Sequence, residues 1–196
     1  MYRKFFKRLL GLLLSIIGLP FFVLIFIIVA PLIYIEDRGP IFYNAPRLGK
    51  NGKIFKMFKF RSMKVNAPDI RNSDGTTYNA EDDPRVTKIG KFLRQTSLDE
   101  TPQLLNVLKG DMSFIGPRPD LPGAEKEIYR PGDIEKLKVN PGITGYSQAY
   151  YRNSSTLEQR FDGDVYYAKN VSLLLDLKIL LRTIKIVLIH ENVYRN

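Results

Sequence analysis

The sequence predicts an α+β fold that is mostly α, organised as a single compact domain behind an N-terminal membrane anchor. Residues 9–35 form a run of 27 residues without a formal charge, which is long enough for a membrane segment. Helical apolar patterns recur at 88–95, 103–109 and 171–189, whereas Phe alternates with Lys or Arg at 57–61, as in a half-buried strand. A chain of 196 residues has room for one hydrophobic core.

The anchor, residues 1–35, contains a proline in its apolar run. As helices, the pieces before and after Pro20 are roughly 16 and 24 Å long, and each is shorter than the ~30 Å hydrocarbon core of a bilayer. Because Pro20 removes a backbone donor and clashes with the preceding turn, it favours a kink at which the chain turns back inside the membrane. A single spanning helix with its basic end in the cytoplasm is the other topology. The residues alone leave both open.

Residues 36–196 are expected to form one domain, because no repeat or low-complexity segment divides them. Short strands and turns are expected at 36–64, where Gly-Pro and Asn-Gly pairs punctuate the chain. Helical patterns follow at 88–95 and 103–109, and a further short helix is expected at 125–129.

The last segment, 171–189, reads as a helix with a thin basic stripe. Lys178, Arg182 and Lys185 recur at spacings of four and three, and leucines and isoleucines fill most of the remainder. Such an amphipathic helix suits the membrane interface, with its cations toward the headgroups. The alternative is a core helix of the soluble domain with one solvent-exposed edge. Asp176 falls nearly opposite the stripe among apolar residues, so a buried partner is expected for it.

The net charge is +10, and the chain contains no Cys, which excludes disulfides, a thiolate nucleophile and Cys-based metal sites. A basic surface attracts anionic lipid, nucleic acid or phosphorylated small substrates. Of these three, the membrane segment favours anionic lipid headgroups. The run at 50–64, in which Lys and Arg are interleaved with Phe, is the feature that favours nucleic acid. Its alternation is better explained by a solvated strand face beside the bilayer, so nucleic acid is not expected as a partner.

An adjacent acidic pair, Asp99 and Glu100, precedes a rigid turn that carries an arginine. On a helix the two carboxylates point about 100° apart, so one can face a reacting phosphorus while the other holds a cation. Pro117 and Pro119 fix φ on both sides of Arg118, which pre-orients its guanidinium for a bidentate oxyanion. Together these residues point to phosphate chemistry.

The same acidic pair has a purely structural interpretation. Ser97 followed by Glu100 is a capping-box pattern, and acidic residues favour the first turn of a helix. Pro102 argues against this interpretation, because a helix capped at Ser97 would carry Pro as its fifth residue and lose a backbone hydrogen bond. From the pair alone, both interpretations stay open.

Four long segments, in the same order, resemble the bacterial sugar transferases known as monotopic phosphoglycosyl transferases. The segments are KIFKMFKFRSM (53–63), DDPRVTKIGKFLRQTSLDETPQLLNVLKGDMSFIGPRPD (82–120), NPGITGYSQAYYRN (140–153) and FDGDVYYAKNVSLLLDLKI (161–179). The resemblance spans almost the whole chain. It implies an anchor at 1–35 that is a re-entrant helix-break-helix at Pro20 and a cytoplasmic, membrane-associated catalytic domain at 36–196. Relatives commonly have Ser before this proline, where the chain has Leu19.

The reaction that the resemblance implies moves a phospho-sugar from a UDP-sugar to polyprenol (undecaprenyl) phosphate and releases UMP. It is a first membrane step of bacterial polysaccharide or glycoconjugate assembly. The nucleophile would be Asp99, through a covalent aspartyl phospho-sugar, and Glu100 would bind Mg²⁺. A carboxylate facing an anionic diphosphate needs such a cation, and Mg²⁺ prefers one or two carboxylates together with substrate phosphates. Two separate half-reactions predict ping-pong kinetics.

The resemblance also implies substrate-binding residues. Arg118, with Pro117 and Pro119, forms the turn that contacts the nucleotide or phosphate of the donor in relatives. Arg94, five residues before the nucleophile, and Arg152, in the YRN segment, are further candidates for phosphate binding. Relatives often have Arg before Pro-Gly-Ile-Thr-Gly, where this chain has Asn140. The sequence does not indicate which sugar is transferred.

The reaction also decides between the two topologies, because nucleotide sugars are held in the cytoplasm. We therefore expect the protein at the cytoplasmic face of the inner membrane, with both Met1 and the domain on that side. The alternative to the enzyme is a single-span membrane protein whose basic domain binds or scaffolds other molecules without chemistry.

Overall fold

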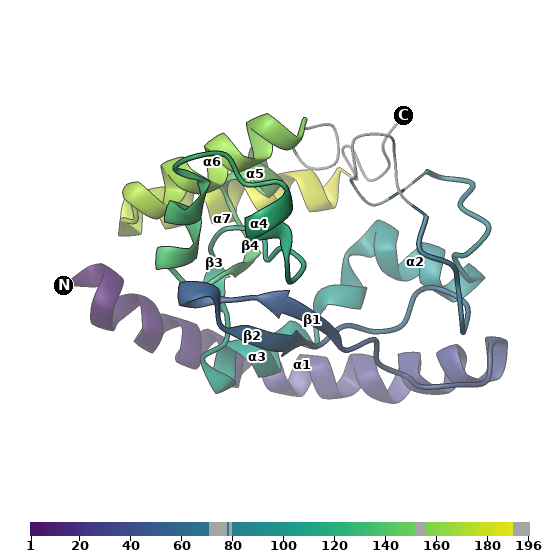
Figure 1. Cartoon of the computed structure of the whole chain (residues 1–196). Coiled ribbons are helices and arrows are strands. Elements are labelled where there is room, and N and C mark those ends of the chain that lie inside the picture. The colour runs from purple at the N-terminus through teal and green to yellow at the C-terminus, as the bar shows by residue number, and fades with distance from the viewer. Residues whose placement is uncertain (71–77, 79, 152–155, 190–196) are drawn as a thin grey trace.

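The computed structural model describes residues 1–70, 78, 80–151 and 156–189 (Figure 1). Helices make up most of the described chain, and strands form two small sheets, which confirms the predicted α+β fold that is mostly α. The elements are, in order, η1 (Tyr2–Phe6), α1 (Lys7–Glu36), β1 (Ala45–Leu48), η2 (Lys50–Gly52), β2 (Ile54–Met57), α2 (Lys88–Thr96), η3 (Leu98–Glu100), α3 (Gln103–Lys109), β3 (Ser113–Ile115), α4 (Ala124–Glu127), η4 (Asp133–Lys138), β4 (Gly142–Thr144), α5 (Tyr146–Tyr150), α6 (Leu157–Lys169) and α7 (Leu173–Leu188).

The N-terminal helix α1 runs along the base of the molecule (Figure 1). It is one helix of 30 residues that includes Pro20 and Pro31, so the helix does not end at Pro20, and the kink expected there stays a prediction. A proline removes one backbone hydrogen bond, and packing on both sides of it can hold the remaining ladder together. Gly18, just before Pro20, lies close to Leu104 of α3, and Phe22, just after it, packs with Phe60. The re-entrant topology stays a prediction.

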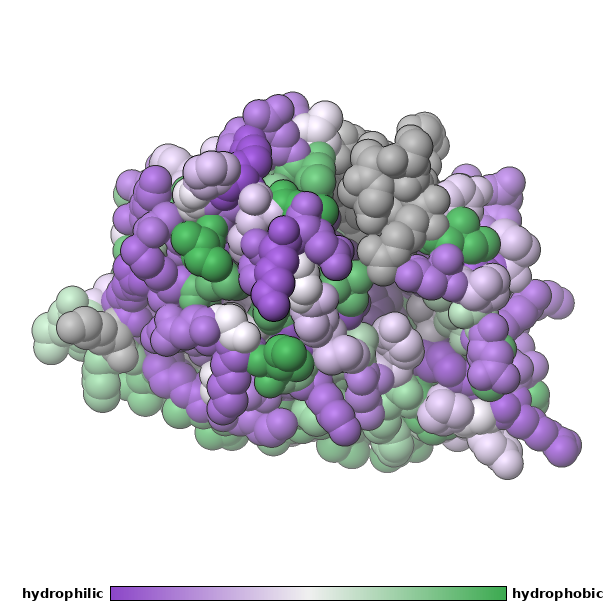
Figure 2. Space-filling view, in the orientation of Figure 1, coloured by the Kyte–Doolittle hydropathy of each residue, from purple (hydrophilic) through white to green (hydrophobic). Residues whose placement is uncertain are grey.

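One face of α1 packs on the rest of the protein, and the other is apolar and exposed. The packed face includes Phe22, Val29 and Ile33, which are buried. The exposed face is a row of large apolar side chains along the length of the helix, including Leu9, Leu13, Ile16, Ile17, Phe21, Leu24, Ile27, Ile28 and Ile35. Figure 2 shows hydrophobic surface along the base of the molecule, where Figure 1 places α1. By length and composition this helix suits a membrane.

Cations of the N-terminal segment hold it to the domain. Lys7 forms an ion pair with Asp176 of α7 at 2.5 Å and also donates a hydrogen bond to the Tyr167 hydroxyl. Arg8 donates to the carbonyls of Val107 and Leu108 at the C-terminal end of α3. These two cations therefore have partners inside the protein.

The helical expectations for the domain are confirmed. The segments 88–95 and 103–109 correspond to α2 and α3, 125–129 to α4, and 171–189 to α7. The buried partner expected for Asp176 is present, since Lys7, Tyr2 and Tyr167 all donate to its carboxylate. On α7, Leu173, Leu174, Leu177, Leu181 and Ile184 are exposed beside the basic stripe. That exposure agrees better with an interfacial helix than with a core helix, and the interfacial position stays a prediction.

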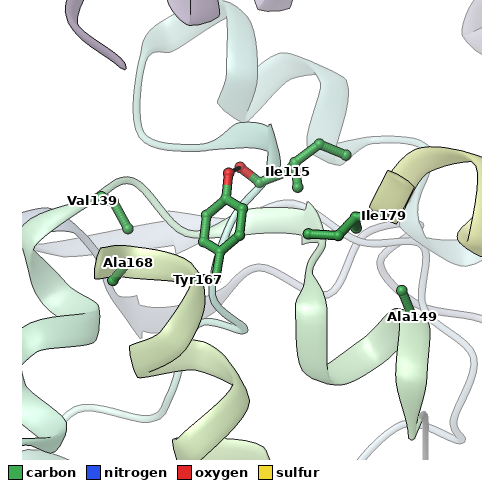
Figure 3. Packing of buried hydrophobic residues seen from close by; sticks show 6 residues of the cluster. All are labelled: Ile115, Val139, Ala149, Tyr167, Ala168 and Ile179. Carbon is green, nitrogen blue, oxygen red and sulfur yellow. Dashed lines mark hydrogen bonds between the residues drawn. The ribbon is translucent and has the colours of Figure 1, made fainter. Parts of the chain in front are cut away.

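A core between β3, α5, α6 and α7 closes the C-terminal half of the domain. Tyr167 lies at its centre, fully buried, among Ile115, Val139, Ala149, Ala168 and Ile179 (Figure 3). Its hydroxyl donates to the carboxylate of Asp176 at 2.6 Å, and the carbonyl oxygen of Ile115 lies 3.1 Å from the same hydroxyl oxygen. Burial and the Asp176 charge raise the pKa of Tyr167 well above its usual value, so the hydroxyl remains a donor.

The two sheets connect distant parts of the chain. In the antiparallel pair β1–β2, Ala45 lies opposite Met57, and a further bridge pairs Phe42 with Phe60. In the parallel pair β3–β4, Ser113 lies opposite Gly142. Strand β2 leads directly into the segment that faces Asp99 and Glu100. The β3–β4 sheet supports the proline-flanked turn.

Candidate active site

The acidic pair lies on the short 3₁₀ turn η3, between α2 and α3. Ser97 ends α2 in the left-handed conformation, with φ of 59°, and its side chain makes no capping hydrogen bond to η3. The capping-box interpretation is therefore wrong, and α3 begins only after Pro102. The turn points the two side chains in different directions: Asp99 is 3% exposed, whereas the Glu100 side chain is 32% exposed.

A lysine from the neighbouring segment reaches both carboxylates. Nζ of Lys59 lies 2.8 Å from Oδ2 of Asp99 and 3.5 Å from Oε1 of Glu100. Burial alone would lower the pKa of Lys59, but the charges of Asp99 and Glu100 outweigh it and raise that pKa. The lysine therefore stays charged, and it offsets one of the two negative charges.

Asp99 differs from the other buried aspartates in how its oxygens are used. Among the described residues, both carboxylate oxygens accept hydrogen bonds in Asp83, Asp120, Asp133, Asp164 and Asp176. For Asp99 only Oδ2 has a partner in that part of the chain. Oδ1 is without a partner yet is not sealed from solvent, because it is absent from the fully buried unpaired atoms. Asp99 is therefore the buried aspartate of this comparison that keeps one carboxylate oxygen without a hydrogen bond in the described part of the chain.

Backbone contacts fix the segment that carries Lys59. The buried Asn106 of α3 accepts from the Phe58 amide and donates to the Lys56 carbonyl, both at 2.8 Å. The Phe60 amide donates to the carbonyl of Asp99 itself at 2.9 Å. These bonds set the register between the strand and the acidic turn, so Lys59 meets Asp99 as a consequence of the fold.

Arg94 lies close to this group. It is half-buried on α2, and its Nε donates to the Ser62 hydroxyl at 3.0 Å. The positive charge of Arg94 opposes the rise in the pKa of Lys59 but is outweighed by the two carboxylates. Arg94 is therefore near enough to Lys59 for their charges to interact. Gly90 allows α2 to come this near, because a Cβ there would lie 2.0 Å from the Ser62 carbonyl oxygen.

The proline-flanked turn is held against the 140–145 loop. The Gly142 amide donates to the Pro117 carbonyl, and a Cβ on Gly116 would clash with the backbone of that loop. Arg118 is exposed and makes no hydrogen bond or ion pair with the described part of the chain, the acidic pair included. Its guanidinium is therefore displayed on a rigid turn and remains available to a ligand.

A buried charge network stands behind this turn. Nζ of Lys136 lies 2.8 Å from Asp120 and 2.6 Å from Asp164, and all three side chains are almost completely buried. Burial would raise the pKa of Asp120, but Lys136 and Arg160 lower it below its usual value. Asp164 also accepts from Ser147 of α5. The network thus joins the residue after Pro119 to α5 and α6.

Comparison with known proteins places the chain in a family. The model of the bacterial sugar transferase family matches residues 2–190. The chain belongs to the bacterial sugar transferase family. Among its relatives, galactosyl transferase CpsE of Streptococcus agalactiae is 43% identical over 93% of this chain and 42% of its own length. Exopolysaccharide production protein ExoY of Sinorhizobium fredii is 39% identical over 96% of this chain and 88% of its own length.

A third relative is undecaprenyl-phosphate galactose phosphotransferase of Salmonella typhimurium, which is 38% identical over 97% of this chain and 42% of its own length. The chain thus spans less than half of CpsE and of this phosphotransferase, and most of ExoY. The similarity of this bacterial sugar transferase to all three covers more than nine-tenths of its chain.

The remaining positions that the sequence analysis linked to substrate binding are Arg152 and Asn140. Arg152 lies outside the described residues, so the prediction for it is untested. Asn140 donates to the Gly110 carbonyl at the end of α3 at 2.9 Å. In this bacterial sugar transferase, position 140 therefore ties its loop to the helix that follows the acidic pair.

Lys59 is the site residue that the sequence analysis missed. Alternation placed it on a solvated strand face, but the alternation changes phase: Phe55 and Met57 are buried, and the next buried aromatic is Phe60. The shift occurs where Asn106 holds the backbone at Phe58, about fifty residues away in sequence. The only local signal was a lysine between two phenylalanines beside Arg61.

Proposed function

We propose that this bacterial sugar transferase is a phosphoglycosyl transferase that passes a phospho-sugar through Asp99. The observation that carries the proposal is the open Oδ1 of an otherwise buried Asp99, next to Glu100 and paired with Lys59. Family membership supports transfer of a sugar unit. The names of relatives, undecaprenyl-phosphate galactose phosphotransferase and UDP-galactose-lipid carrier transferase, support a UDP-sugar donor and an undecaprenyl phosphate acceptor.

The first half-reaction forms one bond and breaks one. An oxygen of the Asp99 carboxylate attacks the phosphorus that bears the sugar, and the bond from that phosphorus to the oxygen of the nucleoside monophosphate breaks. UMP leaves with the electron pair, and no proton is needed because both the attacking and the leaving groups are anions. The product is an acyl phosphate that joins Asp99 to the sugar phosphate.

The second half-reaction regenerates Asp99. A phosphate oxygen of the polyprenol phosphate attacks the same phosphorus, and the bond between phosphorus and the Asp99 oxygen breaks. The carboxylate is restored, and the lipid carries a diphosphate sugar. Donor and acceptor need never occupy the site together, which suits one soluble and one membrane-bound substrate.

Charge neutralisation is the main physical requirement of both steps. Arg118 is free in the described part of the chain to bind the donor as a bidentate partner of phosphate, and Arg94 adds positive charge beside Lys59. Glu100, half-buried and adjacent to Asp99, is the residue that would hold Mg²⁺. Mg²⁺ is usually held by one or two carboxylates together with substrate phosphates, so Glu100 and the donor diphosphate would supply such a ligand set. Mg²⁺ would supply further charge neutralisation at the diphosphate.

The contacts of α1 support a protein that enters the membrane from one side. Lys7 near one end contacts α7, Phe22 in the middle packs with Phe60, and Glu36 at the other end accepts from the first amides of α2. A helix of about 45 Å that crossed the bilayer with these contacts would carry the domain into the hydrocarbon. We therefore place α1 at the cytoplasmic leaflet of the inner membrane, with both ends facing the cytoplasm.

The direct test is magnesium-dependent release of UMP from a panel of UDP-sugars by the full chain in detergent with undecaprenyl phosphate. The proposal predicts turnover of at least one donor by the wild type and none by Asp99→Asn. A protein that binds or scaffolds without chemistry would release no UMP from any donor, and full activity of Asp99→Asn would exclude Asp99 as the nucleophile.

A further inference from the structure

Lys59 contacts the two oxygens of the acidic pair that face the neighbouring strand. Its ammonium group holds Oδ2 of Asp99 at 2.8 Å and lies 3.5 Å from Oε1 of Glu100. The other oxygen of Asp99 makes no hydrogen bond in the described part of the chain and is not among the fully buried unpaired atoms there. When one oxygen of a carboxylate is held in place, the direction in which the other oxygen points is also fixed.

The fold holds the lysine as firmly as the aspartate. The Tyr43 amide donates to the Lys59 carbonyl at 2.8 Å, and the next amide along the chain, that of Phe60, donates to the Asp99 carbonyl. Phe60 is fully buried and stacks on Phe42 and Phe26 with ring centroids 5.4 and 6.3 Å apart. The backbone that carries the ammonium group is therefore fixed on both sides of Lys59.

The pair is built differently from the structural ion pairs of this protein. Arg85 engages both oxygens of Asp83, and Lys136 shares Asp164 with the Ser147 hydroxyl, so neither carboxylate has an oxygen left for chemistry. The Lys59 side chain is 24% exposed, whereas that of Lys136 is 1% exposed, so the pair with Asp99 is less enclosed than the structural pair with Asp164. If the ion pair served stability alone, a hydrogen bond to the second carboxylate oxygen would make the folded protein more stable.

We propose that Lys59 is a positioning residue for the transfer, an inference that rests on the function proposed above. By holding Oδ2, it directs Oδ1 of Asp99 toward the phosphorus that bears the sugar. Oδ1 forms the new bond to phosphorus, the bond to UMP breaks, and Lys59 keeps all its protons. Its positive charge stays beside the acidic pair while the anionic diphosphate approaches.

The test compares the pre-steady-state burst of UMP in four full-length variants with the wild type, using the UDP-sugar that the wild type turns over fastest. Lys59→Met removes the charge and keeps the chain length, whereas Lys59→Arg keeps the charge but changes where it lies. Lys56→Met, three residues earlier and exposed, is the matched control, and Asp99→Asn marks the loss of the nucleophile. Thermal unfolding and the donor KM are measured for each variant.

We expect Lys59→Met to slow the burst about 100-fold, the size expected for losing one preorganised electrostatic contact, with a much smaller change in donor KM. Lys59→Arg should recover part of that loss at an unchanged melting temperature, and Lys56→Met should match the wild type. A wild-type burst rate in Lys59→Met would overturn the proposal. If Lys59→Met does not fold, Lys59→Arg decides, since a wild-type burst rate in that variant overturns it as well.

These outcomes separate the two proposals. If no donor gives a burst with the wild type, or if Asp99→Asn keeps the burst, the proposed function fails. If Asp99→Asn is inactive and the Lys59 variants are unaffected, the function stands and the role of Lys59 is rejected.

Discussion

Nζ of Lys7 lies 2.5 Å from Oδ2 of Asp176, and this contact joins the first turn of α1 to α7, 169 residues away in sequence. Both side chains are nearly buried, at 13% and 8% exposed. Tyr2 and Tyr167 donate to the same carboxylate. The membrane helix is thus part of the folded domain rather than a tether to it.

Removal of Lys7 should therefore destabilise the protein as a whole. Lys7→Met leaves Asp176 without its cation, and breaking a buried pair from one side costs about 3 kcal/mol. A single unfolding transition of the detergent-solubilised protein should shift to lower temperature. Lys178→Met, an exposed lysine two residues from Asp176, should leave the transition unchanged. Equal transitions in the two variants would show that the pair contributes nothing to stability.

Arg118 should affect the donor and not the fold. Its side chain is exposed and makes no hydrogen bond or ion pair with the described part of the chain, so Arg118→Ala should keep the wild-type melting temperature. Loss of a charged hydrogen bond of about 1.5–3 kcal/mol corresponds to a fall of roughly 10- to 100-fold in kcat/KM for the UDP-sugar. Steady-state UMP release gives the value, with the exposed Lys126→Ala as control. An unchanged kcat/KM would remove Arg118 from the donor site.

The network of Asp120 and Lys136 predicts how stability depends on pH. The folded-state pKa of Asp120 lies below 3.8, so its contribution is complete above that value and is lost as the pH falls through the lowered pKa. Burial opposes the charge of Lys136, but Asp164 and Asp120 raise its pKa above 10.5, so its contribution is complete below 10.5 and is lost as the pH rises through the raised pKa.

Chemical unfolding measured across pH should accordingly show a plateau between these limits for this network and a decline at each end. Lys136→Met should lower stability across the plateau and remove the alkaline decline that this lysine causes. An alkaline decline of the same size in the variant would assign that loss to other groups.

The contacts of α1 predict the topology of the protein in cells. The chain has no Cys, so single cysteines can be introduced at Arg3 and at Lys53, both of which are exposed. With α1 entering from the cytoplasmic leaflet, a membrane-impermeant maleimide should label neither position in intact cells and both after permeabilisation. Labelling of one position alone in intact cells would indicate a spanning helix.

The sequence predicted the elements whose signals are local. The helices α2, α3 and α7 were found from their apolar periodicity, and Pro102 correctly argued against a helix that began at Ser97. Asp176 was correctly expected to have a buried partner, although the partner itself was not identified.

Contacts between distant segments could not be predicted in the same way. Lys59 meets Asp99 only because Asn106 shifts the phase of the strand, and no local pattern encodes that hydrogen bond. The partners of Lys7 and Arg8, which are Asp176 and the end of α3, lie more than ninety residues away in sequence and have no local signal. Pro20 signalled a break, and contacts of Gly18 and Phe22 on either side keep the helix continuous.

The central claim is that Asp99 becomes covalently attached to a sugar phosphate, and intact-protein mass spectrometry tests it most directly. Wild-type protein incubated with magnesium and its UDP-sugar, without polyprenol phosphate, should gain the mass of one sugar phosphate, and peptide mapping should place it on Asp99. Addition of undecaprenyl phosphate should remove the adduct, and Asp99→Asn should form none. An adduct of the same mass in Asp99→Asn, or UMP release by the wild type with no adduct at any time, would contradict the account.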